Sequence, residues 1–187
     1  MSFLLRPKSP VTIWHRITTL AALAVAESVE SVAGVSAGIK WPNDVLVNDR
    51  KVAGILAETG TSPIHGPFVV VGIGINVNQT AFPEEISQSA ASLRQVSKGA
   101  VNRGELAGRL IDRFGQWLQK LDADFPTALS GATMRNTVLG KHITLHAGTT
   151  SSTGYAEALD ADGELLLRLP DGSLRAFSAG EVTLRGR

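Results

Sequence analysis

Hydrophobic positions recur at helical intervals in some segments of the chain and alternate with polar positions in others. An apolar run over residues 2–6 predicts a short strand, and Ser9 with Pro10 predicts the start of a helix. The helix is expected to run for about six turns and to end at Gly34. Its buried face is expected to carry the apolar residues spaced at three and four: Ile13, Ile17, Leu20, Ala21, Ala24 and Val25.

A hairpin is predicted next, within residues 38–58. Residues 45–47 favour a strand, Asn48-Asp49 a turn, and residues 51–57 the returning strand. The segment 68–78 begins as a continuous apolar run, which predicts a central strand buried on both faces.

Residues 79–99 lack clear periodicity and predict a long loop with one short helix at most, a type of loop that often covers a site. Asn102, with Glu105 three residues later, predicts the start of an amphipathic helix that ends near Phe125-Pro126. A shorter helix is expected over residues 127–134.

The pattern then changes to short strands separated by turn residues such as Asp162-Gly163. The predicted strands are 143–146, 154–159, 165–169, 174–177 and 182–184. About fifty residues of this kind predict a small all-β barrel. We therefore expect an α+β fold with two domains, an α+β domain over residues 1–135 and the β barrel over residues 136–187.

Composition narrows the functional classes. The 187 residues carry a formal net charge of +1, so no broad positive field is available to bind a nucleic acid backbone. Cysteine is absent, which excludes disulfides and thiolate metal sites and makes a cytoplasmic location the default expectation. The longest apolar stretch near the start, 17–26, is too short to span a membrane, and no signal peptide is recognisable.

The segment around Lys40 is the first candidate site. Pro42 restricts the backbone, and Asn43 and Asp44 favour a turn, so that Lys40 is expected to be held at a strand end. A fixed ammonium group can bind a carboxylate or a phosphate. A surface lysine beside a structural turn explains the same pattern equally well, and Trp41 suits either a pocket wall or the core.

Two glycines in an apolar strand form the second candidate site. Gly72 and Gly74 weaken a strand unless something approaches the backbone closely, and Asn76 would add polar groups on the same face. A ligand would explain these residues, and so would close sheet packing. The segment is no dinucleotide fingerprint, because the third glycine and the following helix are missing.

Other catalytic arrangements find little support. The four histidines are scattered, and His142 and His146 lie in a strand-like region where their spacing builds no helical metal site, so no protein-held metal is expected. There is no GxSxG motif and no cysteine, which argues against a covalent nucleophile.

The segment KWPNDVLVNDRKVAGILAE, followed by VVVGIGINVN, resembles the catalytic domain of biotin protein ligases. The later stretch GYAEALDADGELLLRLPDGSLRAFSAGEVTLR resembles their SH3-like C-terminal domain, so the resemblance covers essentially the whole chain. It implies a mixed sheet with helices, of the class II aminoacyl-tRNA synthetase/biotin ligase kind, followed by an SH3-like barrel.

The resemblance implies ATP-dependent formation of biotinyl-5'-AMP and transfer of biotin to a lysine of a carboxylase acceptor domain, the biotin carboxyl carrier protein. Lys40 matches the lysine that contacts the biotin carboxyl group and the adenylate phosphate, and Mg²⁺ is implied by the ATP chemistry. Asn76 matches an asparagine near the nucleotide phosphates or the metal. The remaining implied substrate-binding residues are Trp41, Asn43, Val45, Gly54, Gly72, Gly74 and Ile75.

One family motif is missing from the printed sequence, a GRGRxGR loop that closes over biotin and the phosphate. Three hypotheses follow. The chain is a biotin protein ligase, with little transfer expected from this chain alone because the loop is absent. Alternatively, it is a non-catalytic paralogue that binds biotin or the acceptor. The third hypothesis is a structural protein whose sheet is completed by a second copy, that is, a homodimer.

Overall fold

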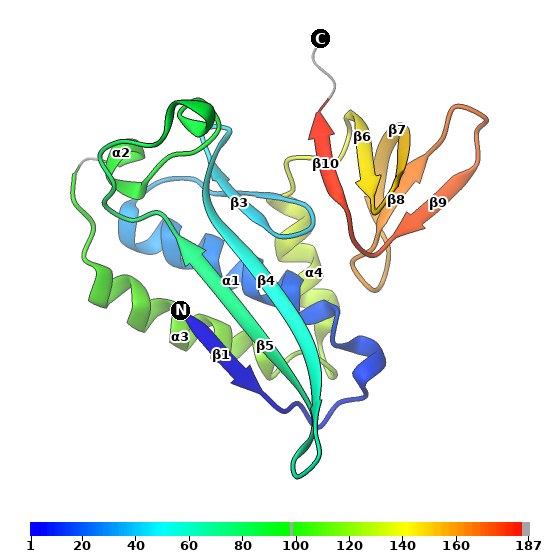
Figure 1. Ribbon diagram of the computed structural model, residues 1–187, viewed down its shortest axis with the longest axis horizontal. Coiled ribbons are helices and arrows are strands. Elements are labelled where there is room, and N and C mark those ends of the chain that lie inside the picture. The colour runs from blue at the N-terminus through cyan, green and yellow to red at the C-terminus, as the bar shows by residue number, and fades with distance from the viewer. Residues whose placement is uncertain (98, 185–187) are drawn as a thin grey trace.

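The structure is a computed structural model, and it describes residues 1–97 and 99–184. Within these residues, ten strands and the helices follow one another along the chain, as shown in Figure 1. The elements of the first part are β1 (Ser2–Leu5), η1 (Val11–Ile13), α1 (Arg16–Ala33), β2 (Gly38–Lys40), β3 (Asp44–Val47), β4 (Arg50–Ser62), β5 (Gly66–Ile75), η2 (Glu84–Ile86), α2 (Leu93–Val96), α3 (Arg103–Leu118) and α4 (Phe125–Met134). Those of the second part are β6 (His142–Ala147), β7 (Thr150–Leu159), β8 (Leu165–Arg168), β9 (Leu174–Phe177) and β10 (Glu181–Leu184).

The strands form two five-stranded sheets, in the orders β1-β5-β4-β3-β2 and β10-β6-β7-β8-β9. The α+β class is confirmed. Every strand pair described is antiparallel, so the first sheet, expected to be mixed, is antiparallel here. Among the described residues, parallel pairing is limited to two isolated bridges, Ile39 with Asn136 and Lys51 with Ala90.

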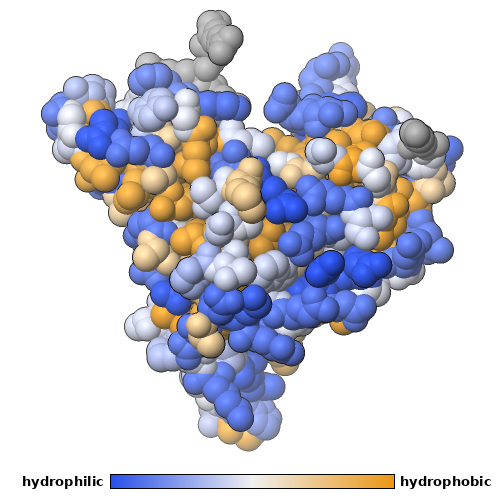
Figure 2. All heavy atoms as spheres, turned by 180° about the vertical axis from the view of Figure 1, so that it is seen from behind, coloured by the Kyte–Doolittle hydropathy of each residue, from blue (hydrophilic) through white to orange (hydrophobic). Residues whose placement is uncertain are grey.

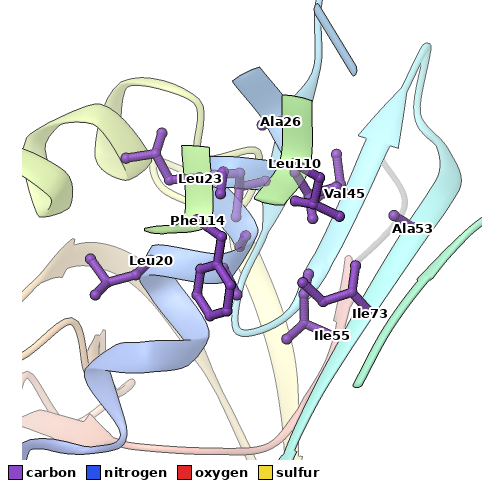
Figure 3. Packing of buried hydrophobic residues seen from close by; sticks show 14 of the residues in the cluster. Leu20, Leu23, Ala26, Val45, Ala53, Ile55, Ile73, Leu110 and Phe114 are labelled. Carbon is purple, nitrogen blue, oxygen red and sulfur yellow. The ribbon is translucent and has the colours of Figure 1, made fainter. Parts of the chain in front are cut away.

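Helices cover one face of the first sheet. In Figure 1, β4 and β5 cross in front of α1, and α3 and α4 flank α1. Figure 3 shows part of the resulting core, where Val45, Ile55 and Ile73 point from the sheet toward the helices, whereas Leu20 and Leu23 of α1 point away from these three residues. α1 was expected to bury one face, but it is buried on nearly all sides because α3 and α4 enclose the faces that the sheet leaves open.

Several helix limits differ from the sequence prediction. α1 begins at Arg16 rather than near Pro10, because Val11–Ile13 form a separate 3₁₀ turn and the indole of Trp14 donates to the Ser9 carbonyl. The end at Gly34 is confirmed, with φ of 64° at that residue. α3 begins after Asn102, whose side chain accepts from the Gly104 and Glu105 amides as expected, but it ends at Leu118, well before Phe125.

β5 is an interior strand, but it is not buried on both faces. Val69, Val71 and Ile73 pack against the helices, whereas Gly72 and Gly74 lie on the opposite, open face. The predicted hairpin turn is confirmed, with positive φ at Asn48 and Asp49. β4 continues to Ser62, so that β4 and β5 form a long hairpin that projects from the molecule (Figure 1).

The second sheet has a core of its own. Its buried residues begin at Val138, and Trp41 of the first part packs among them. The first core ends with Ala132 of α4. The division into domains 1–135 and 136–187 stays a prediction. Among residues 1–97 and 99–184, no helix has the length and apolar character needed to cross a bilayer.

Candidate functional site

Four residues from four neighbouring strands form one row across the open face of the first sheet. Lys40 pairs with Asp44, Asp44 pairs with Gly54, and Gly54 pairs with Gly74. Side chains of directly opposed residues point to the same face of a sheet. The register therefore places the Lys40 and Asp44 side chains beside a surface that the two glycines leave bare.

The turn that follows Lys40 is fastened to β4. The peptide bond between Trp41 and Pro42 is cis. The Asn43 side-chain amide donates to the Ile55 carbonyl at 2.8 Å, and the Ile55 amide donates to the Asn43 carbonyl at 2.9 Å. Asn43 was expected to favour the turn, and in the structure its hydrogen bonds reach across to Ile55 of β4.

Asp44 forms an ion pair with Lys51 across the β3–β4 hairpin. The Lys51 Nζ lies 2.6 Å from the Asp44 Oδ1, and the Asp44 side chain is only 20% exposed. A Cβ at Gly54 would lie 3.1 Å from Lys51 Nζ and 3.5 Å from Asp44 Oδ1. Glycine at position 54 therefore makes room for the ion pair.

Lys40 is half-buried and belongs to none of the ion pairs found among the described residues. Its strand, β2, is backed by residues 135–137, because the Ile39 amide donates to the Arg135 carbonyl. The Glu30 carboxylate in turn binds the Arg135 guanidinium at 2.9 Å and raises the pKa of Arg135. The cation at position 40 is thus available to an anion, whereas those at 51 and 135 are paired.

Two adjacent cavities meet at the Asp44–Lys51 pair. The first, of about 480 Å³, lies over the open face and is lined by Gly54, Leu56, Gly72 and Gly74, among others. The second, of about 670 Å³, is lined by Lys40, Asn76, the η2 region and Glu181–Thr183 of β10. Figure 2, seen from behind, shows a notch between the two upper lobes of the molecule. Both volumes suit small-molecule ligands.

Unlike Gly54, Gly72 and Gly74 on the open face do not serve close packing in the described chain. A Cβ at Gly74 would meet no atom within 4 Å, and one at Gly72 would meet only the Leu56 carbonyl oxygen at 3.7 Å. Packing within the chain therefore gives no reason for glycine at either position, and a ligand lying against the strands would give one.

Two family profiles match the chain. That of the biotin/lipoate A/B protein ligase family matches residues 1–78, and that of the biotin protein ligase C terminal domain matches residues 138–185. The biotin--[acetyl-CoA-carboxylase] ligase of Paracoccus denitrificans is 33% identical over 191 residues, which cover 99% of this chain and 79% of that protein. This chain belongs to the biotin protein ligase family.

Other biotin protein ligases agree with this assignment. The bifunctional ligase/repressor BirA of Bacillus subtilis is 36% identical over 188 residues, which cover 96% of this chain but only 56% of that protein. The chain thus spans little more than half the length of this curated relative. The solved structure of the Aquifex aeolicus ligase in complex with biotin and ATP has a TM-score of 0.84 and 30% identity, covering 98% of this chain and 76% of that one.

The candidate residues taken from the biotin protein ligase resemblance fall into two groups. The first lies on the open face or in the two cavities and comprises Lys40, Asn43, Gly54, Gly72, Gly74 and Asn76. The second lies elsewhere. Val45 is fully buried in the helix-side core, Ile75 packs toward α3, and Trp41 packs in the core of the second sheet.

Sequence reasoning missed several residues that line these two cavities. It assigned Asp44 to the turn alone and gave Lys51 no role, although their opposite charges across a predicted hairpin were a usable signal. It also missed Ser89 and Ala90 of the long loop and Glu181–Thr183 of β10. No local pattern marks these last residues, because only the tertiary fold brings them beside Lys40.

No group of three or more histidine or acidic residues that could hold a metal ion occurs in the part of the chain that the structure describes. His142 and His146 both lie on β6, where His146 contacts the Ser151 hydroxyl and the His142 ring packs edge-on against Tyr155.

Proposed function

We propose that this chain carries the site of a biotin protein ligase, an enzyme that joins biotin and ATP to biotinyl-5'-AMP and then transfers biotin to an acceptor lysine. Little transfer is expected from this chain alone, because the printed sequence lacks the GRGRxGR loop. The observation that carries the proposal is the row formed by Lys40, Asp44, Gly54 and Gly74 at the junction of two cavities. The names of the Paracoccus denitrificans and Aquifex aeolicus proteins support biotin, ATP and an acetyl-CoA carboxylase acceptor.

The cavity over the glycines suits biotin. A bicyclic ring can lie flat against Gly72 and Gly74, where no side chain intervenes, with Leu56 as an apolar neighbour that is 60% exposed in this structure. The valeryl chain would then lead past Gly54 toward Lys40. This arrangement brings the biotin carboxylate to the junction of the two cavities, beside the cation that has no partner in the described chain.

The cavity beyond Lys40 suits the nucleotide. It combines the amide of Asn76 with the apolar side chains of Ile86 and Ala90. Apolar residues can contact the adenine, and Asn76 can hydrogen-bond to the ribose or the phosphates. β10 closes the opposite side, so the second domain contributes to this half of the site.

In the first step, a biotin carboxylate oxygen attacks the α-phosphorus of ATP, the bond to the bridging oxygen breaks, and pyrophosphate leaves. Negative charge builds on the phosphoryl oxygens, where the Lys40 ammonium can stabilise it. In the second step, an acceptor lysine amine attacks the acyl carbon, AMP leaves, and the amine loses a proton. In both steps the role of Lys40 is electrostatic.

The residues of the second cavity fit a magnesium ion that arrives with the nucleotide. Asp44 offers a single carboxylate, which already pairs with Lys51, and Asn76 offers an amide oxygen. Mg²⁺ prefers oxygen ligands and is commonly held by one or two protein groups together with substrate phosphates. The ion would supply further charge neutralisation at the phosphates.

Isothermal calorimetry of the full chain with biotin tests the proposal. We expect saturable binding that Lys40→Ala weakens at least about tenfold, because a charge-assisted contact is lost. Lys120→Ala is the matched control, since that lysine pairs with Asp124 beside α4, away from the cavities. Absence of biotin binding, or equal effects of the two substitutions, would contradict the proposal.

Adenylation and transfer are measured separately. With MgATP, pyrophosphate release that requires biotin would support ligase chemistry, and a streptavidin blot of an added carboxyl carrier domain would report transfer. Biotin binding without pyrophosphate release would instead favour the alternative, a non-catalytic biotin- or acceptor-binding protein.

Two further proposals concern assembly and location. β1 ends its sheet and pairs only with β5 among the described strands, which leaves an edge available for a homodimer. Light scattering of the purified chain tests this. The absence of cysteine supports a cytoplasmic location, which cell fractionation can check.

A further inference from the structure

Lys40 lies between two residues that each bond to the second half of the molecule. On one side, the Ile39 amide donates to the Arg135 carbonyl at 2.8 Å, and the Ile39 carbonyl accepts from the Thr137 amide at 2.9 Å. Residues 135–137 connect α4 to the second domain. The strand that carries Lys40 is therefore fixed from outside its own sheet.

Trp41 provides the second attachment. Its side chain is only 6% exposed and packs in the core of the second domain with residues such as Val138 and Ile143. The indole Nε1 donates a buried hydrogen bond of 3.1 Å to the Gly163 carbonyl, in the turn between β7 and β8. The residue next to Lys40 is thus a member of the other domain's core.

The turn that receives Trp41 is itself rigidly held. The Asp160 carboxylate accepts from the Asp162 and Glu164 amides, both at 2.9 Å. Asp162 Oδ1 in turn accepts from Arg16 Nε at 3.0 Å and from Nη2 at 2.6 Å, at the start of α1. The position of the Gly163 carbonyl is therefore set by contacts that do not involve Trp41.

These attachments matter because β2 is a poor support by itself. It has three residues, lies at the edge of its sheet and, among the strands that the structure describes, pairs with β3 alone. Short edge strands with few neighbours fray readily. A lysine on a fraying strand would have to be ordered whenever it bound an anion, and the lost conformational entropy would weaken binding. An ammonium group stabilises developing charge best when it is already in place.

We propose that Trp41 is a positioning residue for Lys40, through which the second domain holds the ammonium group ready for the carboxyl and phosphoryl groups of the substrates. The inference rests on the proposed function and goes beyond it, because it assigns to the Trp41–Gly163 hydrogen bond a role in ligand affinity. The substrate-binding role expected for Trp41 becomes an indirect one.

The test compares two tryptophans that are matched in burial and bonding. Trp41→Phe and Trp14→Phe each remove one indole donor, because Trp14 is 3% exposed and donates to the Ser9 carbonyl at 3.0 Å. Calorimetry of the full chain is expected to show biotin affinity lowered about fivefold by Trp41→Phe, the effect of one neutral hydrogen bond. Trp14→Phe is expected to change it less than about twofold.

A change of ligand separates positioning from general loosening. Biotin amide has the same ring and chain but no carboxylate, so it cannot use the Lys40 charge. If Trp41 acts through Lys40, Trp41→Phe weakens biotin but leaves the affinity for biotin amide unchanged. In a chain that already carries Lys40→Ala, adding Trp41→Phe is likewise expected to leave the biotin affinity unchanged. Such non-additivity identifies residues that act together.

Asp162→Ala provides an independent route, since it removes the Arg16 bonds that anchor the β7–β8 turn to the start of α1 without altering Trp41. It should weaken biotin and spare biotin amide in the same way, including if Trp41→Phe fails to fold. Equal losses for the two tryptophan variants, or equal losses for the two ligands, would overturn the inference. If Lys40→Ala leaves biotin binding intact, the proposed function fails as well, and the two failures are thereby distinguished.

Discussion

The helix-covered face and the open face of the first sheet alternate along the same strands, and β5 carries both. On the helix side, Val69, Val71 and Ile73 are nearly or fully buried in the main core. On the open side, Gly72 and Gly74 occupy the intervening positions, with almost nothing of the described chain above them. The two faces are built under the same local backbone constraints but with different residue types.

Packing explains one face and leaves the other unexplained. Branched apolar residues favour a strand and bury apolar area, which accounts for the helix side. Glycine within a strand lowers stability, so the open side gives up stability at positions where an alanine would fit sterically. Residues that packing does not require, namely the glycines, Lys40 and Asp44, mark the face where we propose that substrates bind.

The largest expected effect is on stability, and it appears when two adjacent residues on opposite faces of β5, Ile73 and Gly74, are each replaced by alanine. Ile73→Ala should lower the free energy of unfolding by about 2–5 kcal/mol, because it leaves a cavity in the core. Gly74→Ala should leave stability unchanged or raise it by up to about 1 kcal/mol, because a Cβ meets no neighbour there and the unfolded chain loses freedom. Urea denaturation checks both values.

For biotin affinity, the substitution at Gly74 should have the larger effect and that at Ile73 the smaller one. Gly74→Ala places a methyl group in the proposed ring site and should weaken biotin by more than about tenfold, with retained stability as its own control. Ile73→Ala, assayed well below its melting temperature, should bind nearly as wild type. A Gly74→Ala chain that binds biotin normally would show that this face is not the binding surface.

The second prediction concerns charge on the open side. Asp44→Asn removes the carboxylate that neutralises Lys51 and lies across from Lys40, so affinity for free ATP should rise about two- to fivefold at low salt. Lys51→Met should lower it by a similar factor. Both changes should shift stability by less than about 1 kcal/mol, because the pair is partly exposed.

Titration of ATP at two salt concentrations measures the effect, which should shrink as salt rises. Lys120→Met serves as the control, since it removes a lysine from an ion pair elsewhere. Identical ATP affinities for Asp44→Asn, Lys51→Met and wild type would mean that the second cavity does not take the phosphates.

Local patterns predicted much of this fold from the sequence. The turn at Asn48-Asp49, the helix end at Gly34 and the helix start at Asn102 are each specified within a few residues, and all three are confirmed. The five C-terminal strands were also found, because turn residues separate them. Structural features that are set by nearby residues can therefore be predicted from the sequence alone.

The predictions were wrong or incomplete where residues distant in the sequence determine burial and contacts. The run of valines in β5 suggested burial on both faces, but helices cover only one. The same limit applies to the site. Lys40 and the glycines carry a recognisable motif, whereas the attachment of Trp41 to Gly163 spans 122 residues and leaves no mark in either segment. Glu181–Thr183 reach the Lys40 cavity in the same unsignalled way.

The smallest expected effect concerns an exposed ion pair in the second sheet, which belongs to neither face of the first sheet and therefore serves as a reference for both. Arg168 donates to Glu157 from Nη2 at 2.6 Å and also from Nε, and this bonding lowers the pKa of Glu157. A carboxyl group whose pKa is lowered by folding stabilises the protein above its unfolded-state pKa, and this contribution is lost as the pH falls through the folded-state value.

Glu157→Gln should therefore make acid unfolding less steep below about pH 4.3, the ordinary value for glutamate, and leave biotin affinity unchanged. Glu85→Gln, on the surface of the first domain, is the control, and high salt should reduce the difference between the two variants. If wild type and Glu157→Gln lose stability equally as the pH falls, the ion pair adds nothing to stability. A change in biotin affinity would break the comparison itself, because an exposed pair on the second sheet would then affect the open face of the first.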